Sequence, residues 1–155
     1  MIEIERKFLV KSNAYKQSAN KSTHIVQGFL NTDPNRTVRI RIKGEQAFIT
    51  VKGKSNDTGT SRFEWEKNIP VEDAKNLIKI CEQGVIKKIR YEIPSGDHVF
   101  EVDEFFDENQ GLIIAEIELQ DENETFDKPN WLGDEVTGDP KYYNSQLSKL
   151  PFRNW

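Results

Sequence analysis

The chain has 155 residues, of which 31% are charged and 35% hydrophobic, and its formal net charge is −4. This length suits a single domain, residues 1–155, that is large enough to bury a core, and the acidic balance argues against duplex nucleic acid as a partner. The single cysteine, Cys81, excludes a disulfide framework, and no signal peptide or apolar run of membrane length is present. We therefore expect a cytoplasmic protein without a membrane partner.

Apart from Arg6, the even positions of the first ten residues are apolar, and the odd positions Glu3, Glu5 and Lys7 are charged, which is the period of a β-strand. Glu3, Glu5 and Lys7 therefore share one face, with alternate residues roughly 6.6–7 Å apart. Two carboxylates at this spacing can hold one hard cation, or one each of a close pair, and the lysine can meet an anion that the cation also binds. A half-buried strand with a solvated charged face would show the same pattern, so this stretch alone does not distinguish a metal site from an ordinary strand.

Similar alternation continues along the chain and predicts eight strands. In chain order they cover residues 1–10, 24–30, 36–43, 46–52, 60–69, 85–94, 98–106 and 112–120. Apolar residues at helical spacing between Val71 and Cys81, followed by Gly84 at a C-cap position, predict one helix after the fifth strand. Two shorter helices are expected within residues 12–22 and 142–150, and the stretch between the last strand and the last helix is acidic and irregular.

Turn residues separate these strands at hairpin distances, as at Gly44-Glu45, which predicts a mostly antiparallel sheet. Eight strands are enough to close a sheet into a barrel, and closure removes its edges. We therefore expect a mainly β fold of the α+β type, an eight-stranded antiparallel closed barrel with a few short helices.

Charged residues gather on one face of most of these strands. The acidic members are Glu3, Glu5, Glu64, Glu66, Glu101, Asp103, Glu116 and Glu118, and the basic members are Lys7, Arg39, Arg41, Lys43, Lys52, Arg62, Lys88 and Arg90. A sheet with one solvent-exposed face explains the alternation, but it does not explain why uncharged polar residues are so scarce on that face. If this face turns inward, it lines a tunnel whose charges must be paired, hydrated or covered by a ligand. A polyphosphate with Mg²⁺ or Mn²⁺ would use both signs, because arginine suits phosphate and carboxylates suit these cations.

Several motifs in order carry a resemblance to a known family. They are Glu3-x-Glu5-x-Lys7, Gln27-Gly28-Phe29-Leu30, Val38-Arg39-Ile40-Arg41, Thr50-Val51-Lys52-Gly53, Glu64-x-Glu66, Lys88-x-Arg90-Tyr91, Val102-Asp103 with Phe105, Glu116-Ile117-Glu118-Leu119 and Glu135-Val136-Thr137 with Asp139 and Tyr143-Asn144. Together they resemble the CYTH superfamily, the triphosphate tunnel metalloenzymes, and most closely its short bacterial branch. The resemblance implies a tunnel barrel and metal-dependent chemistry on triphosphates, with a triphosphate small molecule as the substrate.

The resemblance also implies roles for individual residues. The implied metal ligands are Glu3, Glu5, Glu116 and Glu118, with Asp103, Glu64 and Glu66 as further candidates. The implied phosphate-binding residues are Lys7, Arg39, Arg41, Lys52, Lys88 and Arg90, with Arg62 as an addition. Glu5, Lys7 and Lys88 are the candidates for catalysis, and Mg²⁺ or Mn²⁺ is the implied cofactor.

One position departs from some relatives, which carry tyrosine where this chain has Phe29. A phenyl ring exchanges no proton, so an acid–base role for that hydroxyl does not transfer to this chain.

Four functions stay open at this point. A metal-dependent inorganic triphosphatase, which cleaves tripolyphosphate to pyrophosphate and phosphate, is our first choice. The alternatives are a class IV-type adenylyl cyclase making cyclic AMP, a thiamine or nucleoside triphosphatase, and a non-catalytic polyphosphate-binding module. The sequence leaves the oligomeric state open, a homodimer included.

Overall fold

The computed structural model describes all 155 residues. Its strands are β1 (Ile2–Val10), β2 (Lys21–Asn31), β3 (Arg36–Lys43), β4 (Gln46–Gly53), β5 (Ser61–Ile69), β6 (Ile86–Ser95), β7 (His98–Phe105), β8 (Ile113–Glu118) and β9 (Leu132–Glu135). Its helices are α1 (Tyr15–Ser18), α2 (Val71–Ile78) and α3 (Asn144–Leu147), with short 3₁₀ turns η1 (Asp107–Asn109), η2 (Pro140–Tyr142) and η3 (Phe152–Asn154). No helix has the length and apolar character needed to cross a membrane.

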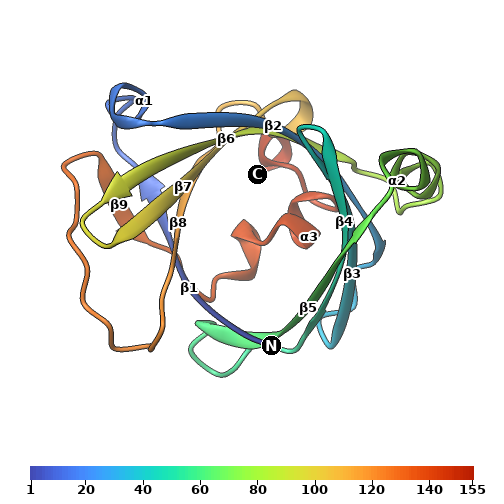
Figure 1. Cartoon of the computed structure of the whole chain (residues 1–155), viewed down its shortest axis with the longest axis horizontal. Helices are drawn as coiled ribbons and strands as arrows, with labels where there is room; N and C mark the ends of the chain where they lie inside the picture. The colour runs from blue at the N-terminus through green and yellow to red at the C-terminus, as the bar shows by residue number, and fades with distance from the viewer.

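Eight antiparallel strands close into a barrel, which confirms the predicted architecture (Figure 1). They follow the order β5-β4-β3-β2-β6-β7-β8-β1, and β1 pairs again with β5. This closing seam is short, because only Ile2, Glu3 and Ile4 of β1 are in register with β5. Beyond the seam, β1 pairs with β8, so the charged faces of the first and the eighth strand lie side by side.

A ninth strand, β9, was not predicted. It pairs with β1 where β1 has left β5, with Phe8 opposite Glu135 and Val10 opposite Leu132. The four-residue strand contains Gly133 and shows no apolar alternation, so its pairing with a segment more than a hundred residues earlier leaves no local signal.

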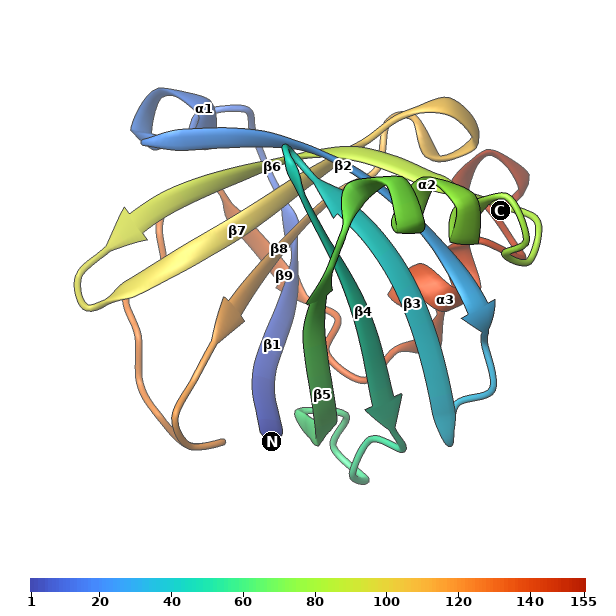
Figure 2. The same cartoon turned by 45° about the vertical axis from the view of Figure 1, so that its right-hand side comes forward.

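The apolar faces of the strands point outward and are covered by helices and loops. Helix α2 packs against β3 and β4, where Ala74 meets Ile40 and Ala47, and Figure 2 shows it lying across the outside of these strands. On the other side, Tyr15 from α1 and Trp131 pack in a cluster with apolar residues of β1, β6, β7 and β8. Because these two cores lie outside the barrel, most of its interior is left to the charged faces.

One part of the interior is apolar, however, and the C-terminal segment fills it. Leu147 of α3 is buried in a cluster with Phe29, Ile86, Phe105 and Ile114, and Phe152 of η3 packs against the same cluster. Helix α3 accordingly lies within the ring of strands (Figure 1). The barrel is therefore plugged where these apolar side chains meet, and its charged cavity occupies the rest.

Helix α2 ends earlier than predicted, at Ile78, so Cys81 lies beyond it and packs, half-buried, against the α2 cluster. Gly84 adopts a φ of 97°, but it does not cap this helix. A Cβ at this position would lie 1.9 Å from the Ser148 carbonyl oxygen, so glycine is required because the C-terminal segment passes close by.

Candidate active site inside the barrel

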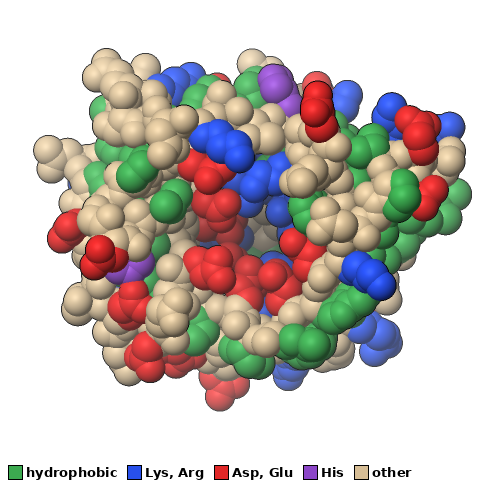
Figure 3. All heavy atoms as spheres, viewed as in Figure 1, with side chains coloured by type: hydrophobic (Ala, Val, Ile, Leu, Met, Phe, Trp, Pro, Cys, Tyr) green, Lys and Arg blue, Asp and Glu red, His purple; other side chains and the backbone are tan.

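The charged faces of the strands line a cavity of about 240 Å³, and Figure 3 looks into a hollow surrounded by acidic and basic side chains. Of its 26 lining residues only two, Phe29 and Tyr143, are hydrophobic. The lining includes Glu3, Glu5, Lys7, Arg39, Arg41, Lys52, Arg62, Glu64, Glu66, Lys88, Arg90, Glu116 and Glu118, which is every predicted site residue except Asp103. The cavity therefore offers charges and hydrogen-bond donors rather than an apolar surface.

Carboxylates from β1 and β8 meet on one wall of the cavity, because the register places Glu5 opposite Glu118 and Lys7 opposite Glu116. Burial and the neighbouring Glu116 and Glu3 raise the pKa of Glu5 well above its usual value. Burial also acts to raise the pKa of Glu116, but Lys7 and Arg90 outweigh it and hold that pKa well below the usual range. A cation would relieve the repulsion that acts on Glu5.

These carboxylates have the chemistry of a hard-cation site, since Mg²⁺ and Mn²⁺ prefer carboxylate oxygens. Their side chains do not converge on a common point in this structure, where no three acidic, histidine or cysteine side chains are grouped around one position. The carboxylates suit such a cation because of their donor type and because a cation would offset the repulsion between them.

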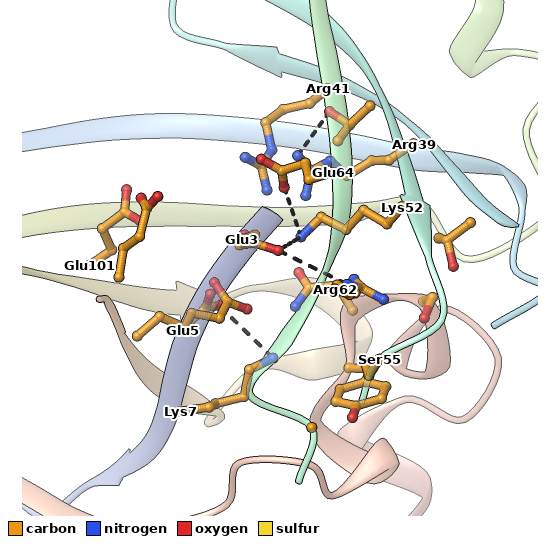
Figure 4. A pocket seen from close by; sticks show the side chains of 18 of the residues that line it. Glu3, Glu5, Lys7, Arg39, Arg41, Lys52, Ser55, Arg62, Glu64 and Glu101 are labelled. Atoms are coloured by element: carbon orange, nitrogen blue, oxygen red, sulfur yellow. Dashed lines mark hydrogen bonds and ion pairs between the residues drawn. The ribbon is translucent and has the colours of Figure 1, made fainter. Parts of the chain in front are cut away.

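The other predicted acids are paired with bases, as Figure 4 shows for β1, β4 and β5. Lys52 Nζ lies 2.9 Å from a Glu3 carboxylate oxygen and 3.2 Å from one of Glu64. Burial acts to raise the pKa of Glu3, but the charge and hydrogen bond of Lys52 outweigh it, so the pKa is lowered. Arg39 lies 3.4 Å from Glu66, and its buried Nε has no hydrogen-bond partner.

Asp103 lies behind the cavity wall, between two basic residues. Its oxygens accept from Lys88 Nζ at 2.7 Å and from Arg90 Nε at 2.7 Å and Nη2 at 2.8 Å. Burial acts to raise its pKa, but Arg90 and Lys88 lower the value to about 2. This buried carboxylate orients the two bases toward the cavity.

Burial leaves some of the basic residues only weakly compensated. The pKa of Lys88 falls to about 7 because burial outweighs the charge of Asp103. The pKa of Arg41 falls to about 9 through burial and then through the nearby charges of Arg39 and Arg90. Arg41 Nε donates to a neutral partner, the Gln27 side-chain oxygen at 2.9 Å, rather than to a carboxylate. A bound anion would supply the missing negative charge.

The C-terminal segment contributes cavity-lining residues that the charge pattern could not reveal. Thr137, Tyr143 and Asn144 line the cavity, and the Tyr142 carbonyl accepts from Lys7 Nζ at 3.3 Å. The sequence signals for these three residues were the motifs Glu135-Val136-Thr137 and Tyr143-Asn144, because their own side chains are neutral and lie on no predicted strand.

A family model for the CYTH domain matches residues 1–151. The chain belongs to the CYTH domain family. An inorganic triphosphatase of Acetivibrio thermocellus is 49% identical over 154 residues, covering 99% of this chain and 97% of the relative. An inorganic triphosphatase of Nitrosomonas europaea is 34% identical over 153 residues, covering 96% of this chain and 97% of the relative.

A crystal structure of an inorganic triphosphatase superposes on this CYTH domain with a TM-score of 0.67 and 32% identity, covering 94% of this chain and 93% of the other. Triphosphatases of the CYTH family depend on a metal. This dependence agrees with the carboxylate donors on β1 and β8.

Proposed function

We propose that this CYTH protein hydrolyses inorganic tripolyphosphate to pyrophosphate and phosphate, with Mg²⁺ or Mn²⁺ as the metal. The observation that carries the proposal is the cavity lining, in which carboxylates and bases face one another and only two of 26 residues are hydrophobic. Such a surface recognises phosphate and metal, whereas sites for drug-like organic ligands are mostly apolar. The cytoplasmic location and the exclusion of duplex nucleic acid stay predictions from the sequence.

Glu5, Glu116 and Glu118, together with Glu3, would hold the metal on the wall formed by β1 and β8. When bound there, the metal would neutralise phosphate charge and lower the pKa of water. The carboxylates would contribute by fixing the cation against the same wall that carries Lys7, which lies 4.0 Å from Glu116.

The bases of the other strands would bind the phosphate chain. Arg39 and Arg41 come from β3, Lys52 from β4 and Lys88 with Arg90 from β6, so they reach the cavity from several directions. The unpartnered Arg39 Nε and the neutral partner of Arg41 leave donor capacity and positive charge for the substrate. Arg62 and Lys7 would extend this clamp. Because binding energy can hold the reacting phosphates in place, much of the catalysis would come from positioning and charge stabilisation.

The cavity does not favour a nucleoside substrate. Stacking on a base needs an aromatic ring on the wall. Phe48 does not line the cavity, and Phe105 lies buried in the apolar plug. Phe29 and Tyr143 are the only rings at the wall, and Phe29 also belongs to the plug. The adenylyl cyclase and thiamine triphosphatase alternatives therefore gain no support from the lining.

The test is product analysis with tripolyphosphate, ATP and thiamine triphosphate, each with Mg²⁺, with Mn²⁺ and with excess chelator. We expect kcat/KM to be highest for tripolyphosphate, activity to disappear in chelator and no cyclic AMP to accumulate. Glu116→Gln protein purified in parallel controls for contaminating phosphatases. Cyclic AMP as the main product from ATP, or a higher kcat/KM for ATP than for tripolyphosphate, would overturn the proposal.

A further inference from the structure

One amide oxygen of the C-terminal segment receives hydrogen bonds from two walls of the cavity. Asn144 Oδ1 accepts from Lys88 Nζ at 2.9 Å and from Gln27 Nε2 at 2.8 Å. Gln27, which is fully buried on β2, accepts in turn from Arg41 Nε at 2.9 Å through its own side-chain oxygen. A continuous chain of side chains therefore joins Arg41 to Lys88 through two neutral amides.

The two cations at the ends of this chain determine the orientation of both amides. Arginine donates hydrogen bonds and accepts none, so Gln27 must turn its oxygen toward Arg41 and its NH₂ group toward Asn144. The amide of Asn144 must then present its oxygen to this NH₂ group. The amino group of Lys88 also donates to that oxygen, so both contacts require the same orientation of Asn144.

This arrangement constrains how Lys88 faces the cavity. A lysine ammonium has three N–H donors. Asp103 Oδ2 accepts one at 2.7 Å and Asn144 Oδ1 accepts a second. The side chain of Lys88 is only 1% exposed, yet the residue lines the cavity, so the third position is the one left for a ligand. Asp103 and Asn144 together set its direction.

Asn144 is itself held firmly, because its helix is anchored in the apolar plug. Leu147, three residues further along α3, is 1% exposed and packs against Phe29 and Ile86. The N–H groups of Gln146 and Leu147 both donate to the Tyr143 carbonyl at 2.9 Å, which fixes the first turn of the helix. The amide is therefore placed by the packing of the apolar plug.

We propose that Asn144 is a positioning residue for the phosphate-binding bases, and that it acts through Lys88 directly and through Arg41 by way of Gln27. The inference rests on the proposed triphosphatase function. It assigns to the C-terminal segment a part in orienting the phosphate clamp, in addition to plugging the barrel.

The test compares Asn144→Ala, which removes the acceptor, with Asn144→Asp, which keeps an acceptor oxygen for both donors. With tripolyphosphate and metal, we expect Asn144→Ala to lower kcat roughly 10- to 100-fold, as for other residues that orient a ligand group. Asn144→Asp should recover most of kcat, but it should raise KM because its added negative charge faces the substrate. Gln146→Ala, on the same helix, is the matched control, because this side chain neither lines the cavity nor makes a hydrogen bond.

A second readout separates positioning from general destabilisation. Tripolyphosphate binding is measured by calorimetry in chelator for the wild type, Asn144→Ala, Lys88→Ala and the double variant. Replacing Asn144 should weaken binding about tenfold in the wild type and clearly less in the Lys88→Ala background, where only the route through Gln27 to Arg41 remains.

Two results would overturn this inference while leaving the proposed function intact. They are wild-type kcat and affinity in Asn144→Ala, or an equal loss of affinity in both backgrounds. An inactive wild-type protein would instead contradict the proposed function, which distinguishes the two failures.

Discussion

Glu5 combines an acidic side chain with surroundings that disfavour its charge. It lies in the cavity beside Glu3 and opposite Glu118, and burial raises its pKa together with the charges of Glu116 and Glu3. Removing its charge should therefore affect stability and catalysis in opposite directions. A residue that costs stability in the free protein is typical of a functional site.

For Glu5→Gln we expect turnover of tripolyphosphate to fall at least about 100-fold, because the metal loses an anionic ligand. Without metal, the variant should be more stable than the wild type at about pH 7.5. The folded-state pKa of Glu5 lies above its unfolded value, so the wild type loses stability as pH rises between the two values. Below the ordinary value, near pH 4, this difference should vanish.

Kinetics with metal and urea unfolding in chelator at both pH values check the Glu5→Gln prediction. Glu45→Gln, in the exposed turn between β3 and β4, is the control and should change neither quantity. A Glu5→Gln protein with full activity would remove this residue from the metal site.

At the scale of elements, local alternation was enough to predict the eight barrel strands. Strand β1 shows why, because its even residues other than Arg6 are apolar and pack outside, whereas Glu3, Glu5 and Lys7 face the cavity. The same logic predicted which charged residues share the interior. It could not show that Asp103 is enclosed by Lys88 and Arg90 rather than facing the cavity, because both arrangements have the same alternation.

Elements whose structure depends on distant partners were not predictable in this way. Strand β9 forms because β1 leaves a free edge beyond its short seam with β5. Asn144 and Gln27 gain their roles only when β2, β6 and α3 come together. Neutral side chains carry no charge pattern, so their alignment appears only in three dimensions.

Helix α3 offers a prediction about the apolar plug. Leu147→Ala should lower the free energy of unfolding by about 2–4 kcal/mol, because it leaves a cavity in the cluster with Phe29 and Phe105. It should also lower kcat, since α3 then holds Asn144 less firmly. Urea unfolding and steady-state kinetics measure both effects.

Leu150→Ala is the matched control for the plug, because this leucine is 55% exposed. Its effect on the free energy of unfolding should stay within about 0.5 kcal/mol. Equal losses of stability in the two leucine variants would contradict the role of the plug.

At the scale of the whole molecule, the strands of the barrel hold like charges together until a ligand arrives. Arg39, Arg41 and Arg90 come from two strands, and their mutual repulsion contributes to the lowered pKa values of Arg39 and Arg41, where burial is the largest cause. The free protein therefore keeps a strained set of charges, and binding of a polyanion should stabilise the entire fold.

We expect tripolyphosphate at about one hundred times its dissociation constant, in chelator, to stabilise the protein by about 2.7 kcal/mol. For a chain of this size, that corresponds to a rise in Tm of roughly 5–11 °C. At the same ligand concentration Arg39→Ala and Arg41→Ala should show a smaller rise, because each removes a phosphate contact. Differential scanning calorimetry measures these shifts.

Lys67→Ala serves as the control for these shifts, because this exposed lysine of β5 does not line the cavity. It should retain the full ligand-induced rise. A wild-type rise in both arginine variants would place their side chains outside the binding site.

The pairing of β1 has a consequence for how the protein is made. Its neighbours β5, β8 and β9 all follow it in the chain, the nearest beginning at Ser61 and the last at Leu132. During synthesis the first strand therefore has no partner until β5 is translated, and its longer pairing with β8 becomes available later still. Such distant pairings make folding slow. Asn144 follows all of these strands in the chain, so the lining of the cavity is complete only after every strand of the barrel has been made.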